Sequence, residues 1–168
     1  MDKQIQITGM NNRYYIKKLT KEKKVEIRVN STKWKIDKEL LSWENQKIYI
    51  NNEDYPLFHT EIKTKLNSYK SQDIKKNIYD ETKFITLDDL IERLIQSNLQ
   101  CHYCHENIFI LYEIVRENKQ WTLDRIDNDL GHNEDNIVIS CLQCNLQRRN
   151  TNSNKFLFTK QLILNKLN

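Results

Sequence analysis

Four cysteines, arranged as two pairs, are the first residues whose spacing predicts a chemistry. The pairs read Cys101-His-Tyr-Cys104 and Cys141-Leu-Gln-Cys144, with 36 residues between them. A CxxC turn directs two thiolates toward one ion, and two such turns complete a tetrahedral shell. We therefore expect one structural Zn²⁺ per chain, because a shell of four cysteines leaves no open position for catalysis.

Other uses of these cysteines agree less well with the sequence. Disulfides are rare inside cells, and a redox-active CxxC motif would not need a second pair. His102 and His105 lie beside the first pair and could replace a thiolate. Four cysteines already fill the shell, however, which favours histidines that are exposed neighbours.

A second group of polar residues lies between the cysteine pairs. The chain reads Asp-Arg-Ile-Asp at 124–127, Gly-His at 131–132, Asp-Asn-Ile-Val-Ile-Ser-Cys at 135–141 and Cys-Asn at 144–145. This order and spacing resemble the HNH, or His-Me finger, nucleases, especially phage, large-virus and restriction-type members whose motif begins Asp-Arg. The resemblance covers about residues 99–150, with a CxxC pair at each end.

The resemblance implies a β-hairpin followed by a helix, a ββα unit that holds one divalent cation, Mg²⁺ or Mn²⁺. The first strand would span 121–126, the loop 127–135 and the second strand 136–140. A short helix carrying Asn145 would follow Cys141.

The same resemblance gives roles to individual residues. It makes Asp124 and Asn145 the ligands of the catalytic metal, and such an oxygen pair suits a hard cation that keeps several waters. It makes Asn136 a structural residue that braces the loop. Each role is taken from the family motif and given to the residue at the matching position of this sequence.

The sequence departs from the common family pattern at Arg125, where most members have a histidine base. Arginine cannot act as a base at neutral pH, because its pKa stays above about 12, but it can hold a phosphate by two hydrogen bonds. His132 is the one histidine of the motif loop, and related Asp-Arg members carry Tyr or His there. An ordinary imidazole pKa near about 6.5 suits a base at cellular pH.

These residues together predict the hydrolysis of a phosphodiester bond. His132 would take the proton of the attacking water, Arg125 would bind the phosphate, and the metal on Asp124 and Asn145 would neutralise the leaving oxygen. The products would carry a 5′ phosphate and a 3′ hydroxyl. We therefore expect a DNA endonuclease acting on duplex DNA.

Two other functions stay open. In one, Asp124 and Asp127 cap a turn, His132 is an exposed loop residue, and the chain is a zinc-stabilised DNA-binding module without catalysis. In the other, the nuclease acts on branched DNA or on RNA. Metal-dependent cleavage of plasmid DNA separates the first of these from an enzyme, and a panel of substrates tests the second.

The distribution of charge also favours a nucleic-acid partner. The formal net charge is +4, yet residues 1–38 hold 11 Lys or Arg and 4 Asp or Glu, against 16 and 19 in the rest. A basic segment attracts polyanions by counterion release, although a solvated surface would look the same. Arg148 and Arg149 could contact phosphates that flank the cut, or simply end a charged helix.

The elements that position these residues are predicted from composition and periodicity. In the N-terminal part, β-branched and aromatic residues predict strands at 14–16, 25–29 and 47–50, with a break at Asn51 to Pro56. Trp34, Trp43 and Tyr14 in this part could dock DNA or fill a core.

Helical spacing begins at Glu61, with Ile62, Leu66, Tyr69 and Ile74 on one face. Thr86, followed by Asp89, predicts the start of a second helix. The apolar C-terminal stretch is expected to pack in the core or, less readily, to form a dimer contact; its members are Phe156, Leu157, Phe158, Leu162, Ile163 and Leu167.

These expectations define an α+β protein of 168 residues. They divide it into a basic β-rich module (1–56), a helical connector (57–98) and a zinc-stapled ββα nuclease domain with a C-terminal helix (99–168). No apolar run reaches the roughly 20 residues of a membrane span, and the N-terminus lacks a signal-peptide pattern, so we expect an intracellular protein. A homodimer and a viral origin stay open, and no small-molecule cofactor is expected.

Overall fold

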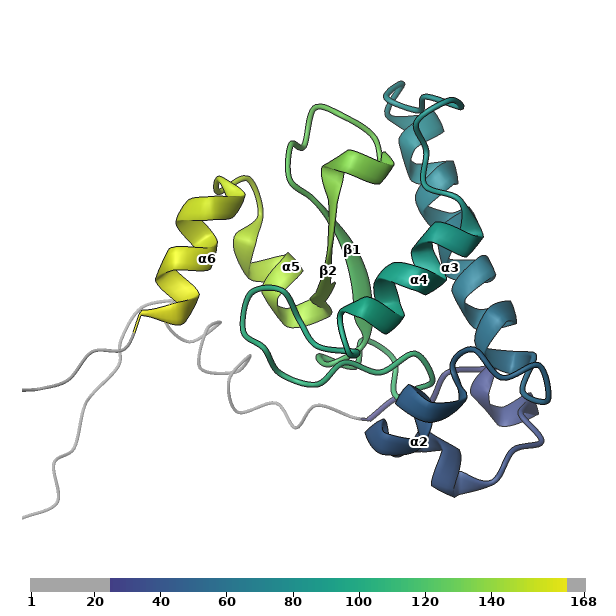
Figure 1. Cartoon of the computed structure of the whole chain (residues 1–168). Coiled ribbons are helices and arrows are strands. Elements are labelled where there is room, and N and C mark those ends of the chain that lie inside the picture. Colours follow the sequence, from purple (N-terminus) through teal and green to yellow (C-terminus); the bar gives the residue numbers. More distant parts are fainter. Residues whose placement is uncertain (1–24, 163–168) are drawn as a thin grey trace, which may run out of the picture.

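A two-stranded antiparallel hairpin lies at the centre of the computed structural model, which describes residues 25–162 (Figure 1). Strand β1 (Trp121–Arg125) pairs with β2 (Ile137–Cys141), with Leu123 opposite Ile139 and Asp124 opposite Val138. Helix α5 (Leu142–Arg148) follows β2 directly and contacts both strands. The expected order of strand, loop, strand and short helix is therefore present, with the strand ends shifted by one residue.

Helices lie on either side of this hairpin. Helices α3 (Leu57–Lys75) and α4 (Leu87–Gln96) are on one side in Figure 1, and α5 and α6 (Ser153–Gln161) are on the other. Short helical turns occur at Ser31–Lys33 (η1), Lys38–Leu41 (η2) and Glu134–Asn136 (η3), and α2 spans Trp43–Tyr49. Across residues 25–162, the fold is a mixture of helices and one two-stranded sheet, as expected of an α+β protein.

Helix α3 buries the predicted apolar face, except that Asp73 is buried in place of Ile74. The helix begins at Leu57, just after Pro56, and so four residues before the expected start. Ile62, Leu66 and Tyr69 are buried as predicted. Ile74, however, is 52% exposed, because the residue four positions after Tyr69 is Asp73, and that carboxylate is fully buried.

Helix α4 begins as the sequence predicts. The Thr86 hydroxyl accepts a hydrogen bond from the backbone N–H of Asp89 at 3.2 Å and donates to the Asp89 carboxylate at 2.5 Å. Two acidic residues lie in the first turn, where they complement the helix dipole. The buried face is formed by Leu90, Ile91 and Leu94, which join the main hydrophobic core.

The prediction of a mostly β N-terminal part is wrong for the described residues. Residues 47–50 lie in and just after helix α2, which begins because the Ser42 side chain accepts from the N–H of Asn45. Residues 25–29 form an isolated bridge, Ile27 with Ile114, and no strand. Periodicity failed here because the runs were too short to distinguish a buried strand from one turn of helix. The expected strand at 14–16 lies outside the described residues.

The described N-terminal residues pack against the rest of the chain. The buried Gln46 amide accepts from the N–H groups of Ile110 and Leu111 at 2.8 and 2.9 Å, and donates to the Leu111 carbonyl at 2.9 Å. The Trp43 indole donates to the carbonyl of Leu99 at 3.0 Å, and Trp34 also lies against the core. Both tryptophans therefore have packing roles in this structure.

At the other end of the described chain, α6 contributes Phe156 and Leu157 to the edge of the core, whereas Phe158 is 68% exposed. Ile163 and Leu167 lie outside the described residues. Within residues 25–162, no helix has the length and apolar character that crossing a bilayer requires.

Candidate functional site

The four cysteines come together from two parts of the fold. Cys101 and Cys104 lie in the loop after α4, Cys141 ends β2, and Cys144 lies in α5. Their sulfur atoms all lie within 4.8 Å of one another. A tetrahedral ion with Zn–S bonds of about 2.3 Å separates its sulfurs by about 3.8 Å, and the Cys104 and Cys141 sulfurs are 3.9 Å apart. The four cysteines could therefore hold a metal ion such as zinc.

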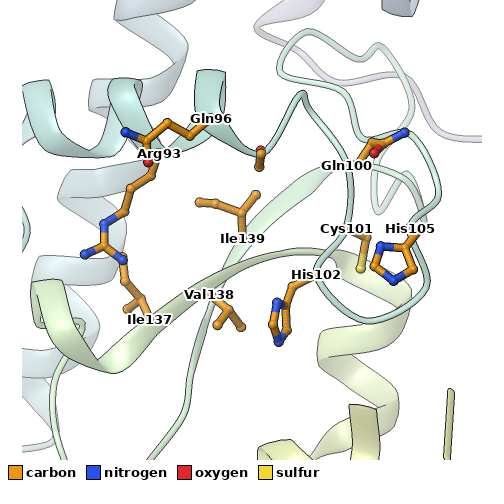
Figure 2. A pocket seen from close by; sticks show the side chains of 10 residues that line it. Arg93, Gln96, Gln100, Cys101, His102, His105, Ile137, Val138 and Ile139 are labelled. Atoms are coloured by element: carbon orange, nitrogen blue, oxygen red, sulfur yellow. The ribbon is translucent and has the colours of Figure 1, made fainter. Parts of the chain in front are cut away.

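The neighbouring histidines do not join this cluster. Among residues 25–162, the four cysteines are the one group of potential metal ligands of this kind. His102 and His105 are exposed and instead border a cavity of about 400 Å³ between α4 and β2, shown in Figure 2. Its floor is Ile137, Val138 and Ile139.

A different cavity, of about 470 Å³, is bordered by most of the residues that the sequence predicted to be catalytic. It lies along the edge of β1 that faces away from β2, between α3 and α5. Five residues singled out in the sequence border it: Asp124, Arg125, His132, Asn145 and Arg149. Helix α3 adds Tyr69 and Gln72, and its C-cap adds Lys76; these residues were not predicted to belong to the site.

His132 is buried and fixed by one carboxylate of α3. Its Nδ1 is 2.8 Å from Asp73 Oδ1, and its backbone N–H donates to Asp73 Oδ2 at 2.6 Å. The Tyr69 ring packs against the imidazole, with centroids 4.5 Å apart. With Nδ1 engaged, Nε2 is the nitrogen left for chemistry, and among residues 25–162 it has no hydrogen-bond partner.

The surroundings of His132 favour its neutral form. Burial lowers the pKa of the imidazole, and Asp73 opposes this shift only in part. Arg125 and Lys76 lower the pKa further through their positive charges. At neutral pH the ring therefore has a lone pair that can accept a proton.

Asp124, the predicted metal ligand, is buried in an ion pair. The Arg148 guanidinium donates to Asp124 Oδ2 at 2.6 Å and to Oδ1 at 2.7 Å. The Tyr103 hydroxyl donates to Oδ2 at 2.8 Å. Oδ2 is thus filled by two donors, whereas Oδ1 accepts one and keeps a second lone pair.

The prediction that Arg148 contacts phosphates flanking a cut is not met by this structure. Arg148 is 2% exposed, and besides Asp124 it donates to the carbonyls of Arg125 and Thr151. The cause is helical spacing, because the third residue after Asn145 on α5 faces β1. Arg149 is exposed and borders the cavity, so it retains the position expected of a phosphate contact.

Asn145 is oriented by the edge of β1. Its amide nitrogen donates to the Leu123 carbonyl and to the Thr122 hydroxyl, both at 3.2 Å. These bonds fix the amide plane and leave Oδ1 without a donor among residues 25–162. An amide oxygen and one free carboxylate lone pair on Asp124 form a donor set that suits a hydrated hard cation.

Arg125 and Asn136 organise the loop between the strands. Arg125 Nη1 donates to the carbonyls of Asn128 and Leu130 at 3.0 and 2.9 Å, and its other nitrogens have no partner among residues 25–162. Asn136 accepts from the N–H of Asp127 and donates to the carbonyls of Asp127 and Gly131. This contact pattern is that of a residue bracing a loop.

Asp73 is the site residue that sequence reasoning missed. It lies outside the motif, 59 positions before His132. A signal was nonetheless present: a carboxylate four residues after Tyr69 falls on the apolar face of a predicted helix, and buried carboxylates nearly always have a partner.

Comparisons with known proteins give no assignment, because no family model, no curated protein and no solved structure matches this chain.

Proposed function

We propose that this protein is a divalent-metal-dependent DNA endonuclease of the HNH type. The observation that carries the proposal is the shared cavity, which is bordered by a histidine whose surroundings favour its neutral form, by cationic side chains, and by Asp124 and Asn145, around one space of about 470 Å³. It also lies on a ββα unit at the motif that resembles HNH nucleases.

The residues of the cavity supply what hydrolysis of a phosphodiester requires. Nε2 of His132 is the group that takes a proton from the attacking water. Arg125 and Arg149 are positively charged groups that hold the phosphate and offset its charge. A phosphate bound between them would lie beside the imidazole that activates the water.

Asp124 and Asn145 would hold the divalent cation through one oxygen each. When bound, it would supply charge relief at the leaving 3′ oxygen. The Arg148 guanidinium shares Asp124 and reduces the negative charge available to the ion. We therefore expect a weakly bound Mg²⁺ or Mn²⁺ that is separate from the zinc on the four cysteines.

Nicking of supercoiled plasmid with added Mg²⁺ tests the proposal. His132→Ala and Asn145→Ala should each reduce the nicking rate on the order of 100-fold or more. His59→Ala, which changes an exposed histidine on α3, should leave the rate unchanged. Unchanged nicking by both site variants would overturn the role assignments.

One observation favours a second function. Because Asp124 is engaged by Arg148 and Tyr103, it already has a structural role that needs no metal. This would fit a zinc-stabilised DNA-binding module without catalysis. A wild-type protein that binds duplex DNA but cleaves neither duplex, branched DNA nor RNA with Mg²⁺ or Mn²⁺ would support that function instead.

A further inference from the structure

We propose that Asp73 is the positioning residue that holds His132 as a proton acceptor, an inference that rests on the nuclease function proposed above. Helix α3 would then be a working part of the active site although it lies outside the motif. The basis is the two-point contact of one buried carboxylate with the backbone N–H and with Nδ1 of the same histidine, at 2.6 and 2.8 Å.

The first consequence concerns which ring nitrogen carries the proton. An ionised carboxylate can only accept hydrogen bonds, so Nδ1 beside Asp73 must be the protonated nitrogen. Nε2 then keeps its lone pair at the cavity. The opposite tautomer would place a proton on Nε2 and remove the base, because a neutral imidazole with Nε2–H cannot accept a proton there.

The second consequence concerns orientation. Asp73 and Tyr69 lie one turn apart on α3 and contact the edge and the face of the imidazole, respectively. The Tyr69 hydroxyl in turn accepts from the N–H of Leu123 at 3.1 Å, which ties the same helix to β1. Two contacts therefore hold the ring against α3, and a third holds α3 against the strand edge that borders the cavity.

The loop sequence permits this close approach. Gly131 precedes His132, and a Cβ there would lie 3.0 Å from Asp73 Oδ2 and 2.6 Å from the carbonyl oxygen of Ile78. A side chain would push the loop away from α3. Glycine thus allows the backbone N–H of His132 to reach the carboxylate.

The charged groups around the imidazole have opposite effects on its pKa. Burial beside Tyr69 lowers the pKa of the ring, and Lys76, just after α3, and Arg125 on β1 lower it too, whereas Asp73 raises it. Loss of the Asp73 charge would therefore not protonate the ring further. Its effect on the rate would come through tautomer and orientation.

The experiment uses the zinc-loaded full chain and Asp73→Asn. An asparagine amide can donate to Nδ1 and so favours the wrong tautomer without changing the volume of the side chain. We expect the nicking kcat to fall on the order of 100-fold or more, with KM for DNA nearly unchanged. Asp129→Asn, in the exposed part of the same loop, is the matched control and should nick normally.

Two further measurements separate positioning from mere structure. In the double variant Asp73→Asn, His132→Ala, the second change should add nothing to the loss seen in His132→Ala alone. In ¹⁵N NMR spectra, His132 of the wild type should show the Nδ1–H tautomer, and Asp73→Asn should shift it toward Nε2–H. The wild-type spectrum tests the predicted tautomer even when the Asp73→Asn protein does not fold.

Three results would overturn the inference: a wild-type Nε2–H tautomer, full activity in a folded Asp73→Asn protein, or an added loss in the double variant. A wild type that nicks no DNA would instead count against the proposed function. In that case the NMR tautomer would still decide whether Asp73 sets the state of His132.

Discussion

Arg148 and Asp124 form a buried, two-point ion pair that joins α5 to β1, with nitrogen–oxygen distances of 2.6 and 2.7 Å. The pair attaches the helix that carries Asn145 and Cys144 to the strand at the cavity. Burial disfavours the charge on Arg148, but the hydrogen bonds and charge of Asp124 outweigh it and raise the pKa of the guanidinium.

Removal of this arginine should destabilise the protein strongly. Arg148→Met leaves the Asp124 carboxylate buried without its cation, which typically costs about 3–5 kcal/mol. Arg149→Met removes an exposed charge and should change the free energy of unfolding by less than about 0.5 kcal/mol. Urea denaturation of both variants measures the difference. Equal stabilities would show that the ion pair contributes little.

Removal of a metal ion held by the four cysteines should unfold the ββα unit. A structural zinc contributes on the order of 10 kcal/mol to small domains, and the four cysteines that would bind it join the loop after α4 to β2 and α5. A strong chelator, or Cys104→Ser, should therefore lower the melting temperature. It should also expose tryptophan side chains to water, which shifts their fluorescence. The purified wild type should contain about one zinc per chain by elemental analysis. A metal-free chain with unchanged melting would exclude a structural metal.

Gly131→Ala should damage both stability and activity. Its Cβ would lie 2.6 Å from a backbone carbonyl oxygen, which cannot move without shifting the chain after α3. Overpacking of this kind costs about 1–3 kcal/mol. Leu130→Ala, at the adjacent half-exposed position, is the control and should be milder. If the glycine variant melts and nicks like the wild type, the close approach is unimportant.

Stability should increase with pH above neutrality because of Lys65. Burial, with a smaller contribution from Arg28, lowers the pKa of Lys65 to about 7 from an ordinary value of 10.5. Between these values the unfolded chain binds a proton that the folded chain does not, so the free energy of unfolding rises with pH across this window. Lys65→Met should flatten that rise in urea titrations at pH 7.5, 8.5 and 9.5. A slope equal to that of the wild type would contradict the shift.

Deletion of residues 1–24 should weaken DNA binding mainly at low salt. These residues hold 7 Lys or Arg and 2 Asp or Glu, and each phosphate contact they make adds to counterion release. The plot of log affinity against log salt should become shallower. An unchanged slope would place the DNA contacts elsewhere in the chain.

Much of the ββα region could be predicted because its signals are local. Two CxxC pairs and a threonine cap identify themselves by residue type and short spacing, and the hairpin followed from the motif between the cysteines. The N-terminal strands could not be predicted correctly, because helix α2 depends on Ser42 as a cap and on the long-range partners of Gln46. The periodicity of three or four residues contains no information about a helix cap or about partners far away in the sequence.

The motif residues of the candidate site were predictable, but the residues that helix α3 adds and the pairings between side chains were not. Asp124, His132 and Asn145 border one cavity, as the motif suggested. That Arg148 binds Asp124 and that Asp73 binds His132 depends on how α5 and α3 pack against β1. The two partners are 24 positions apart in one pair and 59 in the other, and contacts at such separations leave no pattern in a single sequence. The one available signal was the unexpected charge of Asp73 on an apolar helix face.

The buried amide of Gln46 has a consequence for any attempt to isolate the C-terminal region. A fragment beginning near residue 99 would lack Gln46, which accepts from the peptide N–H groups of Ile110 and Leu111, and also the residues of α3 and α4 that complete the hydrophobic core. Residues 43–50 and the hairpin should therefore melt in a single cooperative transition, and excised C-terminal fragments should aggregate rather than fold.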